Sequence, residues 1–176
     1  VHGTQVVESQ SWFAGIQADA AVTREEGVVL GVLSADCLPI LLCDAGAGVV
    51  AVAHAGWRGL ASGVIEATVE KMSVDPQQIM AFLGPAIGAA SYEVGEDVRD
   101  AFMTVDAQAA QAFKTHRPGK YFADLYLLAR QRLAKKGIMS VHGGGFCTYA
   151  GKDRFFSYRR DGPTGRMASL IWISKC

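Results

Sequence analysis

The segment LPILLCDAGAGVVAVAH, residues 38–54, decides the fold of this chain. It contains two short apolar runs, residues 38–43 and 48–53, whose length and bounding Asp and Gly residues are typical of buried strands. The glycine-rich residues 44–48 between them predict a turn. We therefore expect the two runs to be buried strands that pair as an antiparallel hairpin.

This hairpin brings together two residues with metal-binding chemistry. Cys37 stands at the start of the first strand and His54 at the end of the second, and these two ends lie side by side in an antiparallel pair. His2 is a third candidate ligand. A thiolate and two imidazoles suit zinc, and three protein ligands leave a fourth position open, as in catalytic sites. A buried structural thiol and a hydrogen-bonded histidine are the alternative interpretations.

Length and composition favour a folded protein without a general affinity for polyanions. The 176 residues suit one domain, which we expect to span residues 1–176, and 50% of them are apolar. The 17 basic and 17 acidic residues cancel, so we expect no nucleic-acid and no membrane partner. The four cysteines have no disulfide-scaffold spacing, which predicts a cytoplasmic location.

Hydrophobic patterning along the chain indicates a mixed α/β (α+β) fold with segregated sheets. We expect further strands at residues 27–33 and 79–83, and closing strands at 155–158 and 168–173. Apolar residues spaced four apart predict a helix over 60–72, and helices are also expected at 95–103, 106–113 and 124–136.

Two segments carry further candidate residues. In HAGWRG, residues 54–59, the glycines let the backbone approach a ligand, and Arg58 supplies a positive fork for an anion. A tight turn with a packed tryptophan is the equal alternative. In FFSYRRDG, residues 155–162, strand alternation sends Arg159 and Arg160 to opposite faces, so that one of them reaches a given pocket.

Six motifs together resemble the bacterial laccase-domain family, also described as polyphenol oxidase-like proteins and as multifunctional purine nucleoside enzymes. They are VHG (1–3), ADA (18–20) with Thr23, ADCLP (35–39), HAGWRG (54–59), LGPAIG (83–88) with YEVG (92–95), and FSYRRD (156–161). They cover the chain nearly end to end, in the order of the family. The family usually has several dozen residues ahead of the histidine motif, so we expect a preceding segment that this sequence lacks.

The resemblance implies a single-domain sandwich of mixed sheets flanked by helices, of the cytotoxin-like cysteine hydrolase type. It also implies a zinc held by His2, Cys37 and His54 beside a pocket for purine nucleosides. The implied activities are phosphorolysis of adenosine, inosine, guanosine and methylthioadenosine, and deamination of adenosine. The partners are then the nucleosides and phosphate.

The implied chemistry assigns roles to individual residues. Arg58 or Arg160 is the expected phosphate ligand, with Gly56 beside it in the binding loop. Asp36, next to a metal ligand, or Glu93 is the expected proton-transfer group. Cys37, His54, Arg58 and Asp36 therefore form the expected catalytic set.

Three other functions remain open at this point. Copper also binds a thiolate and imidazoles, which keeps a copper-dependent polyphenol oxidase (laccase) as an alternative. A second alternative is a metal-free cysteine hydrolase with Cys37 as nucleophile and His54 as base. The third is a non-catalytic module that zinc stabilises.

Overall fold

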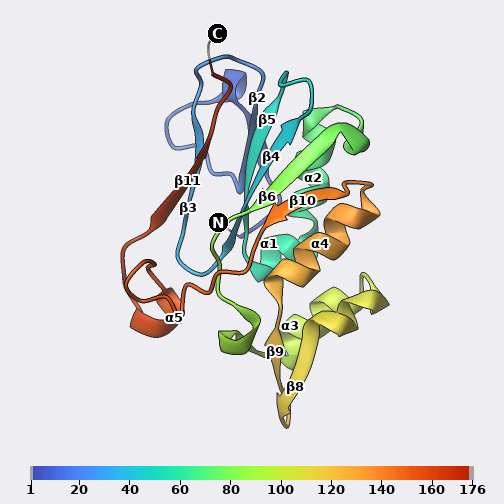
Figure 1. Cartoon of the computed structure of the whole chain (residues 1–176), viewed down its shortest axis with the longest axis vertical. Coiled ribbons are helices and arrows are strands. Elements are labelled where there is room, and N and C mark those ends of the chain that lie inside the picture. The colour runs from blue at the N-terminus through green and yellow to red at the C-terminus, as the bar shows by residue number, and fades with distance from the viewer. Residues whose placement is uncertain (1, 175–176) are drawn as a thin grey trace.

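A computed structural model describes residues 2–174 as three sheets with helices packed against them (Figure 1). The largest sheet has six strands in the order β1-β2-β5-β4-β6-β10; β1–β2 and β6–β10 are parallel pairs and the other pairs are antiparallel. Its strands are β1 (Val6–Glu8), β2 (Ala20–Thr23), β4 (Leu38–Asp44), β5 (Val50–Ala55), β6 (Ile79–Leu83) and β10 (Ser140–Gly143). The expected mixed α/β class is confirmed.

Two smaller sheets complete the fold. An antiparallel ribbon of β3 (Leu30–Ser34) and β11 (Met167–Ile171) lies over one face of the large sheet, and helices cover the other (Figure 1). The third sheet, β7-β9-β8, comprises β7 (Glu93–Gly95), β8 (Phe113–Arg117) and β9 (Lys120–Ala123). The helices are α1 (Trp57–Ser62), α2 (Val64–Met72), α3 (Glu96–Met103), α4 (Leu125–Lys135) and α5 (Tyr158–Asp161), with short 3-10 turns η1 (Ser9–Ser11), η2 (Pro76–Gln78), η3 (Ala89–Ser91) and η4 (Ala107–Ala112).

The expected hairpin is confirmed. Strands β4 and β5 pair antiparallel, with Leu38 opposite Ala55 and Pro39 opposite His54. Ile40 and Leu42 point into the main core on the helix side, whereas Val50 and Val52 point into a second core under the β3–β11 ribbon. Because both faces of the hairpin are covered, its sequence is continuously apolar instead of alternating.

The expected helices are confirmed in part. The helix predicted over residues 60–72 divides into α1 and α2 at Gly63, whose φ of 100° lies in the left-handed region that glycine favours. Helices α3 and α4 agree with the prediction, and the Asp124 side chain caps α4 by accepting from the Leu127 N–H. Residues 107–112 form the 3-10 helix η4 and Phe113 begins β8, so the helix predicted over 106–113 is confirmed in part, with 3-10 in place of α-helical geometry.

The strand expected at residues 155–158 is wrong. Residues 155–157 form no strand and lead into the short helix α5, which begins at Tyr158. Local hydrogen bonding decides the outcome. The Ser157 hydroxyl accepts from the Arg160 N–H, which caps the helix, and the Arg159 N–H donates to a distant carboxylate of Asp36. Strands 27–33 and 168–173 are confirmed as β3 and β11 with shifted ends.

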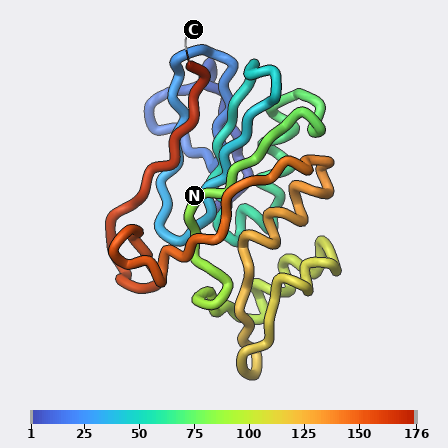
Figure 2. The backbone as a smooth tube through the Cα atoms, in the orientation of Figure 1, coloured from blue at the N-terminus to red at the C-terminus, as the bar shows by residue number. Residues whose placement is uncertain are grey.

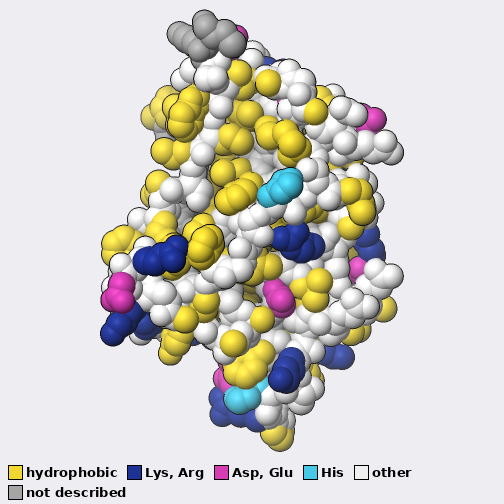
Figure 3. Space-filling view, in the orientation of Figure 1, with side chains coloured by type: hydrophobic (Ala, Val, Ile, Leu, Met, Phe, Trp, Pro, Cys, Tyr) yellow, Lys and Arg dark blue, Asp and Glu magenta, His cyan; other side chains and the backbone are white. Residues whose placement is uncertain are grey.

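The surface carries no dominant charge on the face shown in Figure 3, where acidic and basic side chains are interspersed. This agrees with the formal net charge of zero. Among residues 2–174, the longest helices are too short and too polar to cross a bilayer.

Candidate metal centre and active site

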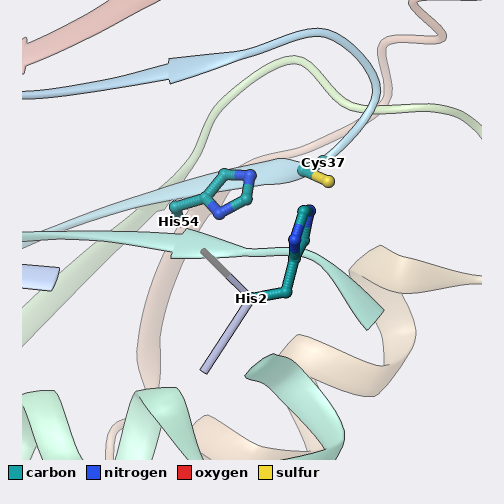
Figure 4. A group of neighbouring side chains, drawn as sticks. All are labelled: His2, Cys37 and His54. Atoms are coloured by element: carbon teal, nitrogen blue, oxygen red, sulfur yellow. The ribbon is translucent and has the colours of Figure 1, made fainter. Parts of the chain in front are cut away.

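His2, Cys37 and His54 come together at one end of the β4–β5 hairpin. These three candidate ligands are called the metal cluster. One potential ligand atom from each side chain lies within 4.8 Å of the other two. His54 extends from the end of β5 and Cys37 directly precedes β4, as strand pairing predicts, while the N-terminal segment brings His2 to the same point (Figure 4). The imidazoles of His2 and His54 approach edge to face, with ring centroids 5.4 Å apart.

Two glycines make room for this cluster. A Cβ on Gly56 would lie 3.0 Å from the Cys37 Sγ and 3.1 Å from the His2 Cδ2. A Cβ on Gly59 would lie 2.8 Å from the backbone oxygen of Gly3, which is closer than such atoms approach in proteins. The HAGWRG loop therefore needs glycine so that the N-terminal segment can lie against the start of α1. Gly56 lies directly against the Cys37 and His2 side chains.

The protonation of the two partly buried members matches a cation site. Burial, and next the Asp36 charge, raise the pKa of the Cys37 thiol to about 11, so a thiolate at this point needs a compensating positive charge. Burial, and next the charge of His2, lower the pKa of His54, which keeps its imidazole neutral and able to act as a ligand. The donor set fits zinc or copper.

The Asp19 carboxylate lies close to His54 and to the backbone next to His2. Its side chain is 2% exposed, and its Oδ2 accepts a hydrogen bond of 2.9 Å from the Gly3 N–H, which fixes the backbone next to His2. Its other oxygen, Oδ1, is buried without a hydrogen-bond partner and lies 4.0 Å from the His54 Nδ1. A carboxylate in this position commonly orients a metal-binding histidine.

Replacing Asp19 with asparagine is expected to weaken metal binding about 10- to 100-fold, because the amide has no second carboxylate oxygen to orient His54. Competition with a chromophoric chelator measures the affinity, and the spectrum of the cobalt-substituted protein reports the ligand geometry. Asp44→Asn is the matched control, since Asp44 accepts from the Gly46 and Val49 N–H groups in the distant β4–β5 turn. Equal affinities in the two variants would show that Asp19 does not act on the metal ligands.

Asp36 is the residue whose expected role the structure changes most. Its carboxylate accepts hydrogen bonds from the Thr148 hydroxyl at 2.5 Å, the Ser157 hydroxyl at 3.0 Å and the Arg159 N–H at 2.7 Å. These partners fix the segment 148–159 beside the β3–β4 turn, as the tube in Figure 2 shows. A carboxylate held by three donors anchors a loop and is poorly suited to proton transfer.

Glu93, the other residue expected to transfer protons, is engaged elsewhere. Its carboxylate accepts two hydrogen bonds from Arg117, at 3.1 and 2.8 Å, and lies 3.4 Å from His116. These contacts, led by the hydrogen bonds from Arg117, lower the pKa of Glu93. Glu93 does not line the cavity beside His2, Cys37 and His54.

A cavity of about 680 Å³ opens beside the metal cluster, a volume within the usual range for small-molecule sites. Its walls include the three candidate ligands and, from other elements, Tyr92, Tyr158, Arg159 and Arg166. Burial, and next the charge of Cys37, raise the pKa of Tyr92 to about 12, so its hydroxyl stays protonated. The FFSYRRDG segment indicates Arg159, whereas Tyr92 is part of the YEVG motif without an expected role and Arg166 is not singled out.

The arginines that reach the cavity differ from those expected to bind phosphate. Arg160 donates to the backbone oxygens of residues 148, 149 and 155 and to the Asp161 carboxylate, so its guanidinium fixes its own loop. Arg58 stacks on Trp57, with its guanidinium carbon 4.4 Å from the ring centroid. Neither lines the cavity, whereas Arg159 and Arg166 do. One arginine of the pair 159–160 reaches the pocket, as expected, but from a helical turn.

Comparison with known proteins gives consistent matches over the described fold. The chain is 52% identical to purine nucleoside phosphorylase YfiH of Escherichia coli, over 98% of this chain and 71% of that protein. It is 50% identical to a purine nucleoside phosphorylase of Pseudomonas aeruginosa, over 98% of this chain and 72% of the relative.

Solved structures agree with this match. The crystal structure of a Neisseria meningitidis protein superposes with a TM-score of 0.97 at 52% identity, over 99% of this chain and 73% of that one. YlmD from Geobacillus stearothermophilus gives a TM-score of 0.85 at 31% identity, over 99% and 72% of the two chains. The family described as multi-copper polyphenol oxidoreductase laccase matches residues 1–174, and this chain belongs to that family.

Proposed function

We propose that this chain is a zinc-dependent purine nucleoside phosphorylase. The observation that carries the proposal is the cavity of about 680 Å³ whose wall contains His2, Cys37 and His54. Relatives at 50–52% identity are named purine nucleoside phosphorylases, which supports the same substrate class. The proposed substrates are adenosine, inosine, guanosine and methylthioadenosine.

In phosphorolysis, the bond between the ribose C1′ and the purine N9 breaks while a phosphate oxygen forms a bond to C1′. The purine leaves with the bonding electron pair and takes up a proton, and ribose 1-phosphate is the second product. The protein has to hold the nucleoside and the phosphate in line and exclude competing water. The walls of the cavity offer the Tyr92 and Tyr158 rings for packing against the base.

Zinc is the proposed metal, held by His2, Cys37 and His54. When bound with an open fourth position, it supplies a Lewis acid that polarises an oxygen ligand and brings the pKa of water close to neutral. The same chemistry supports a second proposed activity, the exchange of the 6-amino group of adenosine for a water oxygen, which releases inosine and ammonia. Copper is the alternative metal for this donor set.

The other functions are less well supported by the site. A copper-dependent laccase uses several coppers, and one cluster of three candidate ligands is present among the described residues. A metal-free cysteine hydrolase needs a Cys37 thiolate, but burial raises the pKa of this thiol to about 11. A non-catalytic metal module does not account for a cavity of ligand size beside the metal cluster.

We expect the metal-loaded protein to convert adenosine to adenine only when phosphate is present, and to form inosine slowly without it. Chromatography of the reaction mixtures measures both products, and elemental analysis is expected to find about one zinc per chain. Protein stripped with a chelator and reloaded with zinc or copper serves as the control for the metal. Full metal content without any purine product, in a version with the length of the E. coli relative, would contradict the proposal.

A further inference from the structure

The residues that line the cavity include two carboxylates, Asp19 and Asp36, and two arginines, Arg159 and Arg166. Both carboxylates accept hydrogen bonds from backbone or hydroxyl groups, and neither forms an ion pair with these arginines. Five arginines form ion pairs within 4.0 Å of a carboxylate: Arg24, Arg99, Arg117, Arg132 and Arg160. Arg159 and Arg166 form no such pair within the described chain, yet both line the cavity. An arginine that faces a pocket without a carboxylate partner is free to bind an anionic ligand.

Backbone oxygens hold the two guanidinium groups in place. Arg159 donates through its Nη1 to the Glu93 backbone oxygen at 2.8 Å, and its guanidinium carbon lies 5.2 Å from the Tyr92 ring centroid. Arg166 donates through its Nη1 to the backbone oxygens of Thr164 at 2.7 Å and Gly165 at 3.0 Å. These contacts are made to neutral backbone oxygens and use one of the two terminal nitrogens of each guanidinium group.

The fold brings both arginines close to the end of β3 and the turn that follows it. Ser34 is one of the residues that line the cavity, and its hydroxyl oxygen is buried without a hydrogen-bond partner. Ser34 pairs with Met167 across the β3–β11 ribbon, which places Arg166 next to the end of β3. The Arg159 backbone N–H donates to the Asp36 carboxylate, which holds Arg159 beside the turn between β3 and β4.

We propose that Arg159 and Arg166 form an oxyanion subsite, beside the metal cluster, that binds a phosphate group. Tyr92 lines the same cavity and offers its hydroxyl as a further donor. A phosphate has enough acceptor oxygens for all three groups. This deepens the proposed phosphorolysis, on which it rests, because it assigns the co-substrate to these side chains.

The phosphate group bound at this subsite can come from two sources, inorganic phosphate or the phosphate group of a purine nucleotide. Calorimetric titration of the metal-loaded protein with inorganic phosphate, with AMP and with adenosine distinguishes them. The variants are Arg159→Gln and Arg166→Gln, which remove the charge but keep a donor, with Ala variants beside them. The control is Arg154→Gln, since Arg154 also has no carboxylate partner among residues 2–174 but stacks on Phe146 and Phe155 outside the cavity.

Each cavity arginine is expected to strengthen phosphate binding at least about tenfold, the effect of one charge-assisted hydrogen bond. The KM for phosphate should rise to the same extent in the variants, while the KM for adenosine changes little. Arginine-dependent binding of inorganic phosphate assigns the free anion to the subsite, and such binding of AMP alone assigns the nucleotide phosphate. Thermal melting identifies any variant that has unfolded, and its Gln or Ala counterpart then replaces it.

Equal phosphate affinity in Arg159→Gln, Arg166→Gln and Arg154→Gln would overturn the subsite. This outcome is separate from a failure of the proposed function. Phosphate-dependent cleavage of adenosine with an unchanged KM for phosphate in both cavity variants keeps the phosphorylase but rejects the subsite. Arginine-dependent phosphate binding without any nucleoside cleavage keeps the subsite but rejects the phosphorylase.

Discussion

Replacing Cys37 with serine is expected to abolish stoichiometric zinc binding and to reduce purine nucleoside cleavage at least about 10³-fold. The hydroxyl is a poor substitute for a thiolate, because soft sulfur ligands favour zinc and copper. Loss of a catalytic metal removes several kcal/mol of transition-state stabilisation, and each 1.36 kcal/mol is tenfold in rate. Elemental analysis and the adenosine assay measure the two effects.

Cys43→Ser is the matched control for this prediction. Cys43 is a free, partly buried thiol near the other end of the same strand, β4, and is not a member of the metal cluster. The control should retain about one metal per chain and most of the activity. If Cys37→Ser kept both its metal and its activity, neither the proposed metal site nor a nucleophilic role for Cys37 would stand.

The Asp36→Ala variant is expected to be destabilised by about 3–5 kcal/mol, because it leaves two buried hydroxyls and an N–H without their charged acceptor. For a chain of this length, that loss corresponds to a decrease in Tm of roughly 6–20 °C. Calorimetry of the metal-free and metal-loaded proteins measures it. We also expect weaker phosphate binding, since Asp36 holds the backbone of Arg159.

Two further variants separate the hydrogen bonds of Asp36 from its backbone strain. The φ of Asp36 is 90°, which disfavours alanine but not glycine. If hydrogen bonds dominate, Asp36→Gly should be about as unstable as Asp36→Ala. Asp36→Asn retains one carbonyl acceptor and tolerates positive φ, so it should lose roughly half as much stability. A stable Asp36→Gly would instead attribute the effect to strain.

The β4–β5 hairpin and its two ligands could be predicted from local sequence, and the structure confirms their pairing. The apolar runs of β4 and β5 are short and bounded by turn residues, and the register of an antiparallel pair then fixes which ends meet. The Gly56 position could also be anticipated, although its reason could not: a Cβ there would crowd the Cys37 and His2 side chains.

The errors fall where distant contacts override local preference. Residues 155–158 have the composition of a strand, yet Ser157 and the Asp36 carboxylate, more than a hundred residues apart in sequence, hold the segment as a helical turn. The same contacts aim Arg159 at the cavity and leave Arg160 to fix its loop. The alternation of side chains along a strand depends only on neighbouring residues, so it cannot predict such distant partners.

The sequence by itself therefore determined the mixed α/β class, the hairpin and the types of ligand at the metal cluster, because each depends on hydrophobic period and residue chemistry over a few neighbours. Only the tertiary structure decided the setting of that cluster. It placed Asp19 behind His2 and His54, used Asp36 as an anchor and selected Arg159 and Arg166 as the arginines of the cavity. These outcomes depend on which charged groups meet across long sequence separations, and that is set by packing of the whole chain.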